Sequence, residues 1–189
     1  MHNRDSQPVR HKASCVVFVL AMAAMLSSVT GVTRADTPAD CADFEWNMTH
    51  ELDLFRTPAT NIAAAPDAAS APVLEAEHLY AVALTDQAAV RFAAAPEAHR
   101  VVDAAKAGIV RLRVPANGHY RLSADGPVWV DAVVADHAVA ANAFNGHSRC
   151  TLIHKSVDFT LAAGTVVVVQ FSQSPRATVR FALTAAPPP

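Results

Sequence analysis

The residues whose side chains could most readily perform chemistry lie together in the last third of the chain. Cys150 lies between His147 and His154, and it is flanked by Arg149 and Lys155. Nearby cations favour the thiolate, so this cysteine could act as a nucleophile. Alternatively it could form a disulfide, while Arg149 and Lys155 could bind a carboxylate or an acidic glycan or form plain surface charge. Which role applies depends on the compartment and on the partners of the cysteine.

Residues 1–35 have the order of a secretory signal. A basic section is followed by the apolar stretch CVVFVLAMAAMLSSVTGV and by the small-residue pattern TRA at residues 33–35, which predicts cleavage after Ala35. An uncleaved anchor is the alternative, but the apolar stretch is short for a bilayer span and contains serine, threonine and glycine. A lipid-modified cysteine is a third possibility, although KAS before Cys15 and PAD before Cys41 lack the small apolar lead-in. We expect a periplasmic or secreted protein with no membrane span after cleavage.

Cleavage would leave an even number of cysteines. Of the three in the chain, Cys15 would leave with the signal, and Cys41 and Cys150 would remain in an oxidising compartment, where pairing is the usual outcome. The sequence therefore predicts a disulfide between Cys41 and Cys150 that closes a loop of about 110 residues.

The charge balance argues against polyanionic partners. Removal of residues 1–35 takes four basic residues and one acidic residue from totals of 15 and 17, which leaves a net charge of −5. An acidic surface repels phosphate backbones and anionic membrane faces. We therefore expect no nucleic-acid partner.

The region 36–76 is predicted to be an N-terminal helix followed by a linker. Phe44, Met48, Leu52 and Phe55 recur at helical spacing within residues 42–55, which predicts one amphipathic helix packed on a sheet. An exposed helix that docks a partner is the alternative. Residues 57–73 are rich in alanine and proline, which is typical of a linker or long loop, and residues 185–189 are predicted to be a disordered tail.

From about residue 77 the hydrophobic period changes to two. The segments with strand-like alternation or continuous apolar character are residues 78–84, 89–93, 108–114, 119–123, 128–134, 156–161, 165–171 and 177–183. About eight short strands separated by turns predict a mainly β fold, an antiparallel β-sandwich resembling a jelly roll, over residues 77–184. Residues 108–114 and 119–123 are expected to form a hairpin around the turn PANG, and 165–171 is expected to be a central strand.

The alternation also predicts which side chains face the core. In the strand at 156–161, Val157 and the apolar residues two and four positions later should point inward, while Ser156 and Asp158 should face water. Likewise, Arg121 in the strand at 119–123 should lie on the wet face. Trp129 is expected to be part of the core or a plug between the sheets, with a sugar-stacking platform as the alternative.

The residues around both cysteines resemble a family of small uncharacterised proteobacterial secreted proteins. The similarity lies in CADFEW with Glu51 near the start and in CTLIHKSVDFTLAAGTVVVVQFS later, where the matching residues are Cys150, Lys155, Ser156, Val157, Phe159, Gly164 and Phe171. It is loose over most of the chain and sharp over roughly the last 40 residues. The resemblance implies a leader, a β-sandwich and a disulfide with no established activity, and some family members carry the label homogentisate 1,2-dioxygenase.

The histidines give a weak metal pattern. A cupin-like iron oxygenase needs two histidines and one carboxylate that converge on the metal, yet no two histidines after residue 35 are closer than seven residues. His119, His147 and His154 are the candidate metal ligands. No catalytic residue or cofactor is predicted, and no GxSxG motif is present. We therefore expect a non-catalytic binding or envelope accessory module for an unidentified ligand or envelope partner, with a small metal-dependent oxygenase as the alternative.

Overall fold

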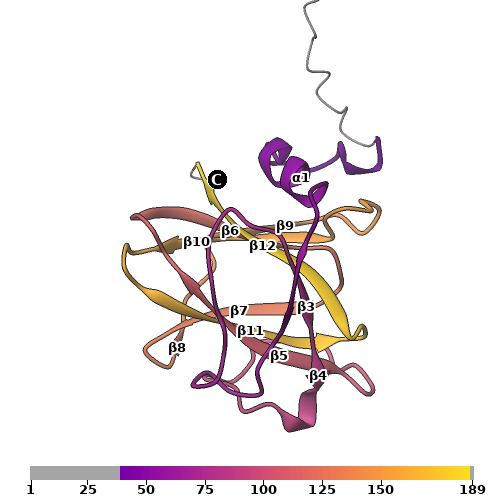
Figure 1. The fold of residues 1–189 in the computed structure, drawn as a ribbon. Helices are drawn as coiled ribbons and strands as arrows, with labels where there is room; N and C mark the ends of the chain where they lie inside the picture. The colour runs from indigo at the N-terminus through magenta and orange to yellow at the C-terminus, as the bar shows by residue number, and fades with distance from the viewer. Residues whose placement is uncertain (1–38, 188–189) are drawn as a thin grey trace, which may run out of the picture. The chain divides into compact units, whose positions relative to one another are not determined.

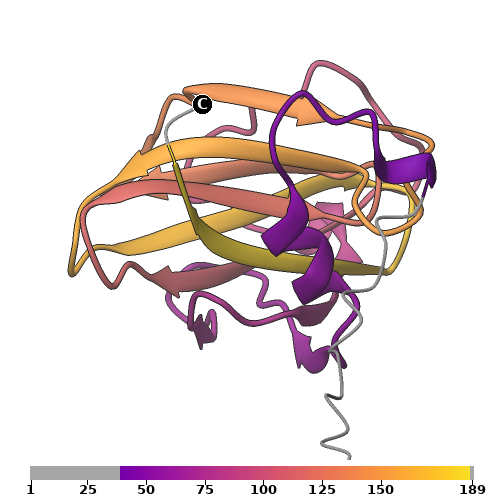
Figure 2. The ribbon, with the colours of Figure 1, turned by 90° about the horizontal axis from the view of Figure 1, so that it is seen from above.

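The computed structural model describes residues 39–187. The predicted leader, residues 1–35, lies outside the described residues. Two mixed β-sheets face each other, and one short helix, α1 (Thr49–Phe55), lies against the outer face of the first sheet (Figures 1 and 2). Single turns of 3-10 helix occur at η1 (Ala39–Cys41) and η2 (Gln87–Ala89). The mainly β sandwich predicted from the sequence is confirmed.

Each sheet has six strands. The first has the order β1 (Thr60–Ala63), β3 (Tyr80–Ala83), β12 (Thr178–Ala186), β6 (Gly118–Ala124), β10 (Lys155–Leu161), β9 (Ala143–Gly146). The second has the order β2 (Val73–Leu74), β5 (Lys106–Arg113), β11 (Val166–Ser174), β7 (Trp129–Val134), β8 (His137–Ala138), with β4 (Thr85–Asp86) also paired to β5.

The main strands pair in a nested order. β3 pairs with β12, β5 with β11, β6 with β10 and β7 with β8, all antiparallel. This is the arrangement obtained when one long hairpin is folded over itself, and it is the jelly-roll order. The sheets are mixed because β1 and β2 add parallel partners to β3 and β5. As expected from its apolar sequence, β11 is central in its sheet.

The predicted hairpin between residues 108–114 and 119–123 is wrong. β5 belongs to the second sheet and β6 to the first, so the chain crosses between the sheets over residues 114–117. The Tyr120 hydroxyl donates to the Ala116 carbonyl at 2.9 Å and fixes this crossover. Alternation shows which face of each strand is apolar, and both strands do face the same core; it does not identify the neighbouring strand.

The apolar core lies between the sheets. The inward side chains are buried as predicted, among them Val157, Phe159 and Leu161 of β10. Phe171 of β11 and Phe181 of β12 meet edge to face across the two sheets, with ring centroids 5.0 Å apart. Such pairs add about 0.5–1.5 kcal/mol beyond their area burial.

The segment predicted as a linker is part of the fold. Residues 57–74 contain β1 and β2, and Ala65 and Ala71 pack on Ile109 at the outer face of the second sheet. On the opposite face of the same strand Gly108 permits a close approach of Ala64, because a Cβ at Gly108 would lie 2.4 Å from the Cβ of Ala64. Arg111 adds two hydrogen bonds to the Ala71 carbonyl, at 2.9 and 2.7 Å.

Three further boundaries differ from the sequence predictions. Residues 89–93 form no strand: Ala89 is the last residue of η2, and the rest is irregular chain. The helix expected over 42–55 begins only at Thr49, although Met48, Leu52 and Phe55 do pack in one buried cluster. β12 continues to Ala186, so the predicted tail begins inside a strand. No helix among residues 39–187 has the length and apolar character needed to cross a membrane.

A buried ion pair fixes α1 to the first sheet. Arg121 of β6 and Glu51 of α1 are 3% and 2% exposed, with Nη1 and Oε1 3.1 Å apart. Arg121 also donates to the Asn47 carbonyl, and its guanidinium lies over the Trp46 ring, 4.9 Å from the centroid. Thr184 donates to the same Glu51 oxygen at 3.2 Å. The predicted exposure of Arg121 is therefore wrong, because the helix covers it.

Removal of one partner should be costly. We predict that Glu51→Ala lowers the free energy of unfolding by about 3–5 kcal/mol, because it leaves the Arg121 guanidinium buried without its carboxylate. Urea denaturation measures the change. Glu45→Ala, an exposed acid on the same segment, is the control and should stay within about 0.5 kcal/mol of wild type. A similarly small effect for Glu51→Ala would contradict a buried pair.

Candidate functional site

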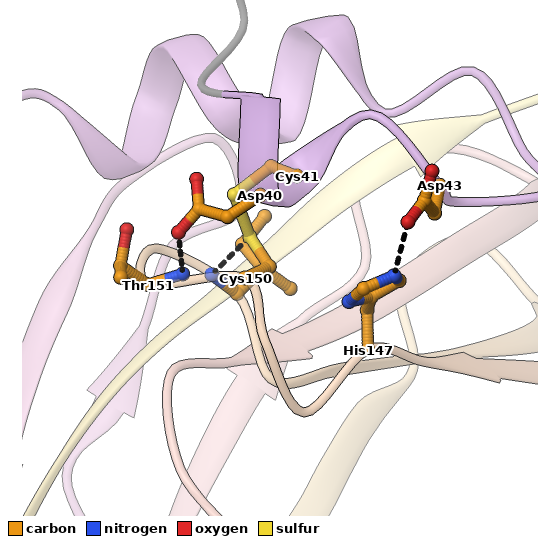
Figure 3. The surroundings of a disulfide bond; sticks show 7 residues. Asp40, Cys41, Asp43, His147, Cys150 and Thr151 are labelled. Atoms are coloured by element: carbon orange, nitrogen blue, oxygen red, sulfur yellow. Dashed lines mark hydrogen bonds and ion pairs between the residues drawn. A yellow bond between two sulfur atoms is a disulfide. The ribbon is translucent and has the colours of Figure 1, made fainter.

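The structure contains the disulfide that the cysteine count predicts. Cys41 and Cys150 are bonded with an S–S distance of 2.03 Å and a Cα–Cα distance of 4.4 Å. The bond ties η1 to the loop between β9 and β10, as Figure 3 shows, and both residues are buried. Asp40 supports the connection by accepting from the Thr151 amide at 3.2 Å. Cys150 is therefore a covalent tie between segments here and carries no free thiol.

His147 belongs to the same attachment. Its Nε2 lies 3.2 Å from Asp43 Oδ2, and the two side chains point toward each other in Figure 3. Arg149 donates to the same carboxylate oxygen at 3.0 Å. The ring of Phe44 packs at a tilt against the imidazole, with centroids 5.7 Å apart. These contacts hold the N-terminal segment on the β9–β10 loop.

The three candidate metal ligands occupy different surroundings. His119 on β6 has Nδ1 3.0 Å from Asp158 Oδ1, which also accepts from Asn142 at 2.7 Å. The His154 side chain lines a separate hollow, although its carbonyl accepts from the His147 amide. Within residues 39–187 no group of three or more His, Cys, Asp or Glu is placed to hold a metal. The donor set expected for a cupin-like iron oxygenase is thus not formed by His119, His147 and His154.

Asp158 and Ser156 are buried, contrary to the prediction that they face water. Both are 0% exposed. Ser156 shares a hydrogen bond of 2.9 Å with Ser123 on β6, and Asp158 pairs with His119. They do point away from the apolar core, but other residues cover the outer face of the first sheet here.

A different set of residues converges where β7 and β10 face each other across the sandwich. Trp129 is the first residue of β7 and Lys155 the first of β10. Lys155 Nζ lies 5.0 Å from the centroid of a Trp129 ring and donates to the Val128 carbonyl at 3.2 Å. Trp129 Nε1 donates to Asp131 Oδ1 at 2.7 Å. Because β7 and β10 lie in opposite sheets, these contacts bridge the two layers.

Two hollows share Trp129 and Lys155 in their linings. The inner hollow has a volume of about 190 Å³ and reaches apolar side chains between the sheets; besides the two shared residues it is lined by Glu97, Val130, Asp131, Val139, Ala141, Phe144, Val157 and Phe159. The outer hollow has a volume of about 270 Å³, and its other lining residues are His99, Arg100, Pro127, Val128 and His154. We call the pair the Trp129–Lys155 cavity.

Burial sets the protonation behaviour of this cavity. It raises the pKa of Asp131, against the opposing hydrogen bonds from Trp129 and Gln170. It lowers the pKa of Lys155; Asp131 opposes this shift and Arg100 adds to it. It also lowers the pKa of His154, with the charges of Lys155 and Arg100 acting in the same direction. The cavity thus holds Asp131, His154 and Lys155 partly out of bulk water.

Sequence reasoning missed most of this site. The sequence predicts Trp129 in the core or as a plug between the sheets, whereas it is half-buried and lines both hollows. Lys155 was named as a possible carboxylate ligand together with Arg149, but only Lys155 lines the cavity. A lysine at the first position of a buried strand was the one available signal. Glu97, His99 and Arg100 come from a loop without periodicity, so no pattern could place them.

The disulfide should contribute strongly to stability. We predict that the double change Cys41→Ser and Cys150→Ser lowers the free energy of unfolding by about 2–5 kcal/mol, because the unfolded chain regains the freedom of a long loop. Chemical denaturation measures this. Mass spectrometry of the oxidised protein without reductant should find no free thiol at positions 41 and 150. Two free thiols there would contradict the structure.

Lys155 should reduce stability where it stands. Its pKa is lowered in the folded state, so the unfolded chain binds more protons between the two pKa values and stability rises with pH in that window. We predict that Lys155→Met stabilises the protein by roughly 0.5–1 kcal/mol at neutral pH, and that the gain fades as the pH approaches the unfolded-state lysine pKa. Thermal denaturation across pH measures both effects.

The control for this change is Lys106→Met. Lys106 pairs with the exposed Asp86 at the surface, so its replacement should give no stabilisation. A Lys155→Met variant less stable than wild type, or a gain that does not vary with pH, would show that the ammonium is well solvated.

Comparisons with known proteins give no further guide to this site. The chain matches no protein-family model, and searches of curated proteins and of solved structures gave no significant match. The resemblance to small proteobacterial secreted proteins therefore stays a prediction, and the function is argued from the geometry of the cavity.

Proposed function

We propose that this chain is an extracytoplasmic, non-catalytic binding module whose small-molecule ligand occupies the Trp129–Lys155 cavity. The location is supported by the leader pattern of residues 1–35 and by the disulfide, which suits an oxidising compartment. The jelly-roll frame would hold Trp129, Lys155 and the deeper walls of the inner hollow in place, because these residues lie on strands of both sheets.

The observation that carries the proposal is the environment of the Lys155 ammonium. An ammonium group has three donors, and within the part of the chain that the structure describes Lys155 Nζ donates only to the Val128 carbonyl. Its charge lies over Trp129 at the junction of two hollows. Lys155 is partly buried, and a charge removed from water costs stability unless it is paired, so the arrangement fits a side chain kept for a ligand.

The shape of the cavity fits the same role. Ligand sites are concave and mostly apolar, with a few polar groups that fix orientation. The inner hollow combines aliphatic and aromatic walls with Asp131 and Glu97, and the exposed Phe144 lies in its lining, 77% accessible. An aromatic ring left this open could close over a bound molecule.

Blocking the cavity tests the proposal. We predict that some members of a library of small fluorinated fragments bind the wild-type protein, as seen by broadening of their fluorine NMR signals. Ala141→Trp should abolish this binding, because Ala141 is exposed and lines the inner hollow. Ala162→Trp, at an exposed alanine in the β10–β11 turn, is the matched control and should bind the same fragments.

Two results would contradict the proposal. One is a library with no binding fragment. The other is unchanged binding by a folded Ala141→Trp protein, which would place the fragments elsewhere.

A further inference from the structure

We infer that the ligand of the Trp129–Lys155 cavity is a small amphipathic carboxylate, with its apolar part in the inner hollow and its carboxylate between Lys155 and Arg100. This inference rests on the proposed binding function and adds the chemical class and the orientation of the ligand.

The size of the inner hollow limits the apolar part. A cavity of about 150 Å³ in another protein is large enough to hold benzene, and the inner hollow is about 190 Å³. It can therefore hold one aromatic ring or a short branched chain. Val130, Val157 and Phe159 supply the deeper walls and are themselves buried, so this space is hydrocarbon on several sides.

The charges of the outer hollow favour an anion. Its lining contains Arg100 and Lys155 and no aspartate or glutamate. Burial disfavours the charged form of Lys155, Asp131 opposes this effect, and Arg100 adds to it. A carboxylate bound between Lys155 and Arg100 would reduce the repulsion between these two cations and accept charge-assisted hydrogen bonds from both. Arg100 is exposed and uses one donor on the Pro127 carbonyl at 2.7 Å, which leaves other guanidinium donors for a ligand.

The acids of the inner hollow set the orientation. Glu97 and Asp131 lie in its lining, so an anionic group placed there would meet like charge. The apolar part must therefore enter the inner hollow while the carboxylate stays outside. Trp129 lines both hollows. It would therefore lie beside the bond that links the apolar part of the ligand to its carboxylate.

Tryptophan fluorescence gives a direct readout. Trp46 and Trp129 are the two tryptophans of the chain, so Trp46→Phe leaves Trp129 as the only one. The probes are benzoate, its neutral analogue benzamide, the cation benzylamine, the dianion phenyl phosphate, and acetate as a carboxylate without an apolar part. Benzoate should change Trp129 emission at concentrations about tenfold or more below those needed for any other probe.

Two variants locate the carboxylate. In the same background Arg100→Gln and Lys155→Met should each weaken benzoate binding about tenfold or more while leaving the weak benzamide binding unchanged. Arg113→Gln removes an exposed cation on β5 that lines neither hollow and should bind benzoate like the parent. Because Arg100 is exposed, its variant reports on binding even if Lys155→Met alters folding.

Each other result overturns a stated part of the inference. Equal binding of benzamide and benzoate, with both blocked by Ala141→Trp, would keep the cavity as a ligand site but reject the carboxylate. Tighter binding of benzylamine or phenyl phosphate would assign a cation or a phosphate instead. Acetate binding as tightly as benzoate would show an adventitious ion only. If no probe binds and no fragment binds, the proposed function itself fails.

Discussion

The burial of two apolar sheet faces against each other is the constraint on which the rest of this structure depends. The nested pairing of the strands gives the sheets one shared core, in which Phe171 meets Phe181. The same pairing leaves β7 and β10 next to the short strands β8 and β9. Trp129 of β7 and Lys155 of β10 are in contact across the two layers. Beside them the apolar core opens into the inner hollow. The nested strand pairing therefore determines both the fold and the position of the cavity.

The N-terminal segment completes the structure from outside. Its helix covers polar residues on the first sheet through the Glu51–Arg121 pair, while residues 57–74 cover Ile109 on the second. The disulfide anchors the start of this segment to the loop that leads into β10. That loop leads directly to Lys155, the first residue of β10, so the covalent connection lies close in sequence to one wall of the cavity. Attachment of the N-terminal segment and shape of the site are therefore linked.

Sequence patterns predicted the layers better than the contacts between elements. Period-two alternation identified the inward residues of β10, such as Phe159, and the cysteine count predicted the disulfide. Alternation carries no information about which strand is adjacent, so it predicts a hairpin where the chain crosses from β5 in one sheet to β6 in the other. Composition suggested a linker at residues 57–73, but small residues also suit close packing on a sheet, as where Ala64 lies against Gly108 of β5. The cavity depends on Arg100 and Glu97, which only the tertiary fold brings to Trp129.

The central claim is that this fold holds the Lys155 ammonium partly out of bulk water, where it lines two hollows and is proposed to bind an anion. The most direct test is an NMR titration of the Lys155 side chain in the intact protein, with Lys106 as the internal reference. The account predicts a Lys155 pKa clearly below that of a lysine in the unfolded chain, because burial disfavours its charged form. An ordinary lysine pKa would contradict the account, since it would place the ammonium in solvent and leave the cavity without its defining charge.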